Sequence, residues 1–245
     1  MTLRYSDGRQ IYTQSVLLED AEQTVRLEHG GAPAWIHPNA AERGYYRWLT
    51  TPEGLQAIAG SGPRALDARE RVGFVNNLAA LLDGGQLNAD DYLATLKRFT
   101  DDPAPEVVSA VIAGLETIHA TFIGPDLRGS FAVAVRRFLR PSLKRFGMVL
   151  GRGEPDAVSL MRPGLLAALG VHAYEREVLD WARLAARRYM ARPDSVDASV
   201  AGAALNLAAR DGDAALYDAY RLRFESTKVP FETGLQQCEH DSQRQ

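Results

Sequence analysis

Alternating apolar and polar positions occupy roughly the first fifty residues and predict short β-strands. Four segments have this pattern: Gln10–Leu18, Glu22–Glu28, Ala34–His37 and Arg43–Leu49. Within the second segment Val25 and Leu27 alternate with polar neighbours, which is the period of a half-buried strand. So few short strands make a thin sheet with exposed edges, and helices or further strands have to cover it.

After Thr51-Pro52 the apolar positions take a helical spacing and keep it. Asp67–Glu70 resembles a capping box, and Asn88 can cap the next helix, which ends at Asp101-Asp102-Pro103. Six more helices are predicted at 105–122, 126–146, 155–169, 173–191, 196–210 and 213–226. Pro141 should kink or split the helix at 126–146, and Gly60-Ser61-Gly62-Pro63 reads as a loop between helices.

These lengths and short turns predict a mainly α fold. A short N-terminal antiparallel β region is expected over 1–50, followed by an α-helical, HEAT-like solenoid of antiparallel helix pairs over 51–231. No strict sequence period is present, and a closed all-α bundle is the alternative. The tail over 232–245 loses all apolar periodicity and is expected to be disordered.

Composition narrows the possible partners. A net charge of −3 argues against nucleic-acid binding, which depends on excess Lys and Arg. The single cysteine, Cys238, excludes a disulfide framework and a thiolate metal cluster. No apolar run reaches the roughly 20 residues needed to cross a bilayer, and the first ten residues do not resemble a signal peptide. A cytoplasmic protein without membrane contact is therefore expected, although a fragment can have lost a targeting segment.

Catalytic motifs are missing from the sequence. The five histidines are His29, His37, His119, His172 and His240. No two of them stand four residues apart, so the helical His-Glu-x-x-His arrangement for zinc is missing, and no metal or other cofactor is expected in this chain. There is no Gly-x-Ser-x-Gly nucleophile motif either. An independent peptidase is thus a poorly supported third hypothesis.

One charged feature offers a binding site. Six basic residues and one acidic residue lie between Asp126 and Phe146. Arg136, Arg140 and Lys144 are four residues apart, so they share a helix face and can receive a carboxylate or a phosphate. The alternative is a solvated helix face balanced by acids on neighbouring helices. The sequence leaves both interpretations open.

Three segments carry a family resemblance. Trp35-Ile36 and Asn39, followed by Gly44-Tyr45-Tyr46-Arg47, resemble the end of the third domain in zinc aminopeptidases of the aminopeptidase N and puromycin-sensitive aminopeptidase family. Asp67–Leu81 is similar to an early helix of that family's C-terminal helical domain, and Gly153–Leu166 to a later loop and helix. The resemblance covers roughly residues 10–231, in the family's order and spacing.

The resemblance implies that residues 1–50 hold only the last strands of a β-sandwich. It also implies that the zinc ligands and catalytic groups lie in an earlier domain that this chain lacks. The chain is then expected to be a non-catalytic C-terminal part of a zinc aminopeptidase that shapes the substrate cavity, with no activity alone. Its expected partners are a peptide substrate or the missing catalytic domain, and Arg136, Arg140 and Lys144 are the substrate-binding candidates. A split gene, a frameshift and a deliberate fragment all remain open as its origin.

The second hypothesis is a stand-alone helical-repeat scaffold that binds a protein or peptide. A solenoid normally ends in a polar capping repeat. No cap is evident around Leu216, Tyr220 and Phe224, so we expect an exposed apolar face there and a homodimer formed through it.

Overall fold

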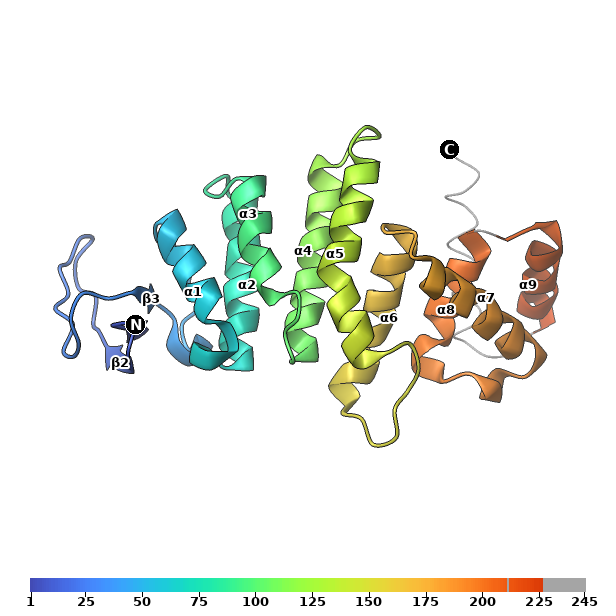
Figure 1. The fold of residues 1–245 in the computed structure, drawn as a ribbon, viewed down its shortest axis with the longest axis horizontal. Coiled ribbons are helices and arrows are strands. Elements are labelled where there is room, and N and C mark those ends of the chain that lie inside the picture. The colour runs from blue at the N-terminus through green and yellow to red at the C-terminus, as the bar shows by residue number, and fades with distance from the viewer. Residues whose placement is uncertain (211, 227–245) are drawn as a thin grey trace. The chain divides into compact units, whose positions relative to one another are not determined.

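The computed structural model describes residues 1–210 and 212–226 of the chain. It forms two compact units, Met1–Arg145 and Phe146–Gln245. Nine α-helices and one small antiparallel sheet lie within the described residues, so the predicted mainly α class is confirmed (Figure 1). The HEAT-like array and the division near residue 50 stay predictions. The tail predicted to be disordered lies outside the described residues.

The sheet has three strands in the order β2-β1-β3. Strand β1 (Thr2–Ser6) lies in the middle, antiparallel to β2 (Ile11–Ser15) and to β3 (Trp35–His37). Leu3 and Tyr5 are buried on one face of β1, as the two-residue period of a strand requires. The sequence prediction missed β1.

Two of the predicted strands are not strands in the structure. Segment 22–28 contacts β2 through a side chain, because the Gln14 amide donates to the Arg26 carbonyl and accepts from the Glu28 N–H. In segment 43–49 the backbone of Trp48 bonds to the Asn77 side chain in both directions. In both segments a side-chain amide bonds to part of the backbone, and neither segment belongs to the sheet.

The first unit contains five helices: α1 (Pro52–Ala65), α2 (Ala68–Asp83), α3 (Ala89–Leu96), α4 (Pro105–Phe122) and α5 (Arg128–Phe146, whose last residue opens the second unit). Their starts follow the capping rules, since Thr51, Asp67 and Asn88 each accept a first-turn N–H. A 3₁₀ turn, η2 (Lys97–Phe99), follows α3. Helix α1 contacts β3 and α3, and α2 packs on α4.

Two sequence predictions about breaks need correction. Helix α1 runs through Gly60–Pro63, where a loop was expected, with one non-helical residue at Gly62 (φ 41°). Glycine permits this left-handed backbone without a Cβ clash, so the helix resumes after a single kinked position. For Pro141 only the predicted split is wrong, because α5 continues through this residue, and a kink there stays a prediction.

The second unit holds α6 (Asp156–Val171), α7 (Arg176–Ala191), α8 (Ala198–Arg210) and α9 (Ala214–Ser226). Fully buried Arg162 ties the preceding loop to α6. Its guanidinium donates to both Glu154 oxygens and to the carbonyls of Phe146 and Gly147. The hydrogen bonds from Arg162 lower the pKa of Glu154 to about 2, so this pair stays charged at neutral pH.

None of the helices in the described ranges is both long and apolar enough to span a membrane.

Candidate functional site

The three predicted substrate-binding residues lie on helix α5. Arg140 and Lys144 are exposed and Arg136 is half-buried. Arg136 and Arg140 each already have an interaction within the protein. The basic row, Arg136, Arg140 and Lys144, is therefore partly used in contacts within the protein. A ligand would have to share Arg136 and Arg140 with these contacts.

Acids of a neighbouring turn balance one end of the same helix. Arg145 Nη2 lies 2.7 Å from Asp101 Oδ1, and both side chains are largely exposed. The Ser142 hydroxyl donates to the Thr100 carbonyl at 3.2 Å. These contacts fix α5 beside the end of η2, and they agree in part with the alternative of a balanced, solvated helix face.

Residues that carry the family resemblance build the joint between the sheet and the helices. The Asn39 side chain accepts from the Gly44 N–H at 2.8 Å and donates to the Gly44 carbonyl at 3.0 Å. The same amide nitrogen donates to Glu42 at 3.0 Å. One buried amide thus closes the turn that contains the 3₁₀ segment η1 (Ala40–Glu42).

Gly44 and Tyr46 complete this turn. The Tyr46 ring lies where a Cβ on Gly44 would be, and its hydroxyl donates to the Pro38 carbonyl at 2.7 Å. Any larger residue at position 44 would displace the ring. The Asn39, Gly44 and Tyr46 pattern therefore has a structural explanation, and none of these contacts points to catalysis.

A half-buried acid, Glu42, and a buried histidine, His37, face each other in the joint. His37 Nε2 lies 3.7 Å from Glu42 Oε1, and neither atom has a hydrogen bond among the described residues. Burial, assisted by Arg4, lowers the pKa of His37 to about 4. Burial and the Glu70 carboxylate raise the pKa of Glu42 to about 7. Both side chains thus favour their neutral forms inside the joint.

Neighbouring charges surround this pair. Glu70, fully buried, closes the capping box of α2, accepts from the Ala41 N–H and lies 3.0 Å from Arg4 Nη1. Gly73 leaves the space that the Glu42 carboxylate fills, since a Cβ there would clash with it. The joint therefore holds a polar network between η1, β1 and α2.

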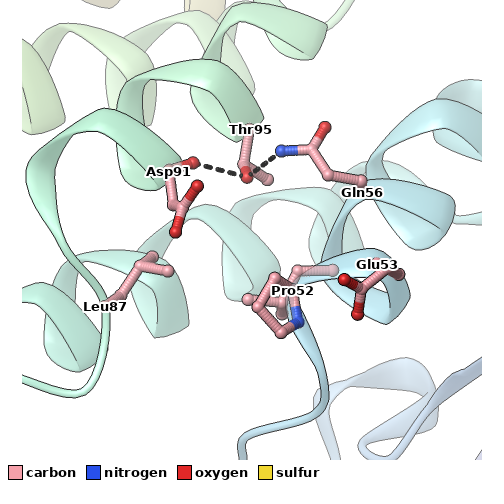
Figure 2. A pocket seen from close by; sticks show the side chains of 7 residues that line it. Pro52, Glu53, Gln56, Leu87, Asp91 and Thr95 are labelled. Atoms are coloured by element: carbon pink, nitrogen blue, oxygen red, sulfur yellow. Dashed lines mark hydrogen bonds between the residues drawn. The ribbon is translucent and has the colours of Figure 1, made fainter.

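A second candidate site is a partly enclosed hollow between α1 and α3 (Figure 2). Its volume is about 330 Å³, near the lower end for ligand pockets. Seven residues line it: Pro52, Glu53, Leu55, Gln56, Leu87, Asp91 and Thr95. Two of them are acidic and none is basic.

Hydrogen bonds fix the polar wall of this hollow. Gln56 Nε2 donates to Thr95 Oγ1 at 2.6 Å, and Thr95 Oγ1 donates to the Asp91 carbonyl at 2.7 Å (Figure 2). Asp91 Oδ2 also accepts from the Asn88 side chain at 2.7 Å. The wall is thus ordered before any ligand arrives.

The sequence reasoning missed this hollow. A partial signal was present, because Thr51-Pro52-Glu53 and Asn88–Asp91 both have the composition of a helix start. Only the packing of α1 against α3 brings Glu53 and Asp91 to one hollow, and no local pattern reveals that.

The expected exposed face at the C-terminal helix is wrong for two of its residues. Leu216 and Tyr220 are half-buried and pack against a cluster of Ala186, Tyr189, Ala201, Leu205 and Ala208. Among the described side chains of α9, Tyr217 and Leu222 are the exposed large apolar ones. Helix α9 thus covers the cluster with two of the three residues that were expected to be free. The side chain of Phe224 lies outside the described ones, and the homodimer stays a prediction.

The sequence lacks the His-Glu-x-x-His motif that binds zinc in metallopeptidases. His37 does not fit such a role, because its Nδ1 accepts the Asn39 N–H at 3.3 Å and its other nitrogen faces Glu42 inside the joint. We therefore assign no zinc-binding role to His37.

Comparison with known proteins gives independent evidence of the family that this chain resembles. A family model described as the ERAP1-like C-terminal domain matches residues 35–238. The chain is 25% identical over 124 residues to tricorn protease-interacting factor F2 of Thermoplasma volcanium, a match over 51% of this chain and 15% of that protein. It is 26% identical over 130 residues to the factor of the same name from Thermoplasma acidophilum, over 52% of this chain and 16% of that protein. The chain thus matches only a small part of the length of these relatives.

Proposed function

The chain belongs to the ERAP1-like C-terminal domain family, the C-terminal region of zinc aminopeptidases, and from this premise we propose that it shapes the substrate cavity of such an enzyme. In this role the chain is non-catalytic, and the enzyme that contains it removes residues from the N-terminus of a peptide. The missing His-Glu-x-x-His motif supports the non-catalytic part of the proposal.

The basic row on α5 is the observation that carries the proposal further. Arg136, Arg140 and Lys144 recur every four residues, and the last two are exposed. A peptide that enters an aminopeptidase by its N-terminus keeps its C-terminal carboxylate at a distance from the chemistry. Guanidinium and ammonium groups on one helix face hold such a carboxylate by charge-assisted hydrogen bonds.

Binding of matched peptides tests this role. The full chain is titrated with a peptide that ends in a free carboxylate and with the same peptide ending in an amide. We expect the acid to bind several-fold more tightly, with amide NMR shifts along α5. Arg140→Gln combined with Lys144→Gln should remove this difference, because both exposed cations of the row are then gone.

Arg137→Gln is the matched control, since Arg137 is an exposed arginine of the same helix outside the row. This variant should keep the preference for the carboxylate. Equal binding of acid and amide by the unaltered chain would refute the role of the row. In a reconstituted enzyme, an unchanged peptide-length preference after replacement of all three residues by Ala would refute it too.

A stand-alone scaffold that binds a protein or peptide is the second candidate function. The helical packing of the described residues and the hollow between α1 and α3 are compatible with it. The coding sequence upstream separates the two functions. A reading frame there that encodes His-Glu-x-x-His with a later Glu favours the enzyme, whereas unrelated flanking genes favour the scaffold.

A further inference from the structure

The hollow between α1 and α3 has apolar walls and an acidic rim (Figure 2). Leu55 and Leu87 are buried, and Pro52 completes the apolar lining. Exposed Glu53 and half-buried Asp91 lie on either side of Pro52 (Figure 2). A ligand that fits this arrangement combines an apolar stem with a positive charge.

Two hydrogen-bond donors of the wall are already used. A Gln56 N–H and the Thr95 hydroxyl hydrogen donate within the wall itself. The ionisable groups at the rim are carboxylates, which only accept hydrogen bonds when ionised. The hollow therefore favours a ligand rich in donors and disfavours an anion.

We propose that this hollow binds the side chain of a lysine presented by a peptide. The methylene stem would lie against Pro52, Leu55 and Leu87, as lysine stems do on apolar surfaces. The ammonium would sit between Glu53 and Asp91 and share its three donors between them. This binding site is independent of the basic row on α5, so either proposal can fail alone.

Lysine fits better than arginine because the two carboxylates come from different helices. Glu53 belongs to the first turn of α1, and Asp91 to the first turn of α3. A guanidinium is best satisfied by two parallel bonds to one carboxylate, whereas a compact ammonium can bridge two separate acceptors. The volume of about 330 Å³ suits one side chain better than a folded element.

The competing explanation is that both acids only complement helix dipoles. Acidic residues in a first helical turn are stabilising for that reason alone. Helix α4 supplies a direct comparison, since it begins with Pro105-Glu106 as α1 begins with Pro52-Glu53. Asp90 is an exposed first-turn acid of α3 that does not line the hollow. These two residues make matched controls.

The test is a titration of the full chain with N-acetyl-lysine-amide, followed by backbone amide NMR. We expect shifts confined to residues 52–56 and 87–95 and a dissociation constant of roughly 1 mM. N-acetyl-norleucine-amide, which lacks the ammonium, should bind about fivefold more weakly. Glu53→Gln and Asp91→Asn should each weaken lysine binding by about threefold, the scale of an exposed ion pair.

The control variants Glu106→Gln and Asp90→Asn should bind lysine like the unaltered chain. Leu87→Ala should weaken lysine and norleucine together, because it removes part of the apolar wall. Circular dichroism of each variant separates loss of binding from loss of fold. The proposal is overturned if norleucine binds as well as lysine, if N-acetyl-arginine-amide binds more tightly, or if folded Glu53→Gln and Asp91→Asn chains bind lysine normally. Absence of any shift at these residues would overturn it as well.

Discussion

The two compact units bury different kinds of side chain. In the first unit, rings follow one another from the sheet into the helices: His37, Trp48, Phe74 and Phe99, with centroid separations of 5.2, 5.7 and 5.7 Å. In the second unit, α7 and α8 pack closely through buried alanines, Ala182, Ala185, Ala186, Ala201, Ala204 and Ala208.

This difference predicts opposite weaknesses. A large buried ring makes many contacts, so its removal leaves a cavity that the neighbours cannot fill. Alanines let two helix backbones approach closely, so an added side chain has no space. The first unit should therefore suffer most from truncation of a side chain, and the second from enlargement.

Truncation of Phe74 should give the largest effect. Its side chain is 0% exposed and contacts both Trp48 and Phe99 rings. Phe74→Ala should lower the free energy of unfolding of the first unit by about 3–5 kcal/mol. Urea unfolding followed by the fluorescence of Trp35 and Trp48, both in the first unit, in a Trp181→Phe background, measures it. Phe74→Leu should cost clearly less, and a loss under about 1 kcal/mol for the alanine variant would contradict the ring-based core.

Enlargement of Ala201 should have the next largest effect. This residue is 1% exposed and belongs to the cluster that includes Ala186 on α7. Ala201→Leu should destabilise the second unit by about 1–3 kcal/mol through overpacking. Hydrogen exchange measured over α7 and α8 should show faster opening there. Ala209→Leu, on an exposed position of α8, should leave the exchange unchanged, and equal protection in both variants would argue against close helix contact.

The pH response should be smaller and confined to the first unit. The pKa of Glu42 is raised from 4.5 to about 7, so the unfolded chain loses its proton first and stability falls as the pH rises between these values. The pKa of His37 is lowered from 6.5 to about 4, so stability falls as the pH drops through that range. The two responses oppose each other in the intact protein.

Replacement of either residue, His37 or Glu42, should reveal the pH response of the remaining one. Glu42→Gln should make the stability of the first unit rise with pH between about 4 and 6.5, and His37→Gln should make it fall between about 4.5 and 7. Charges on the neighbouring elements, Arg4, Asp67 and Glu70, stay in place in both variants. If the stability of the two variants changed with pH in the same direction, the pKa shifts of His37 and Glu42 would not be linked to folding. Amide hydrogen exchange over α8, which lies in the second unit, is the internal control and should be the same in both variants.

The smallest effect is expected at a buried hydroxyl. Burial raises the pKa of Tyr92 to about 12, and its hydroxyl has no hydrogen bond among the described residues. It lies against Gly114, where a Cβ would clash with it. Tyr92→Phe should therefore change stability by less than about 0.5 kcal/mol or raise it.

Tyr5 supplies the comparison for Tyr92. Its ring is equally buried, but its hydroxyl accepts the His29 N–H at 3.2 Å. Tyr5→Phe should cost about 1 kcal/mol. A larger loss for Tyr92→Phe than for Tyr5→Phe would reveal a partner of the Tyr92 hydroxyl, such as an ordered water.

Helices were well predicted from the sequence where caps and apolar spacing agreed. The segment 105–122 matches α4, because Pro105 marks its first turn and the apolar positions repeat regularly. The helical pattern after Thr51-Pro52 agrees with α1, but its glycines and Pro63 suggested a loop at 60–63, where the helix continues. The tolerance of one kinked glycine inside a packed helix depends on tertiary contacts that no local pattern shows.

Strands were less predictable because composition does not specify a partner. Segment 43–49 is rich in aromatic residues, yet Tyr46 packs on Gly44 and Trp48 bonds to Asn77. The family motif was recognisable from the sequence, but its role as a turn closed by the Asn39 side chain was not. The acidic hollow was not predictable either, since it depends on the contact of α1 with α3.

Asn39 also makes the joint sensitive to slow chemical degradation. Hydrolysis of its amide to a carboxylate would replace the donor that holds the Gly44 carbonyl and Glu42 with an acceptor, at almost unchanged size. The attraction to the Gly44 carbonyl would become repulsion, while the bond from the Gly44 N–H would survive. The burial of Asn39 protects its amide from water and should slow this hydrolysis. Amide hydrogen exchange over η1, measured in aged and fresh samples, would show whether degradation of the protein begins at the Asn39 side chain.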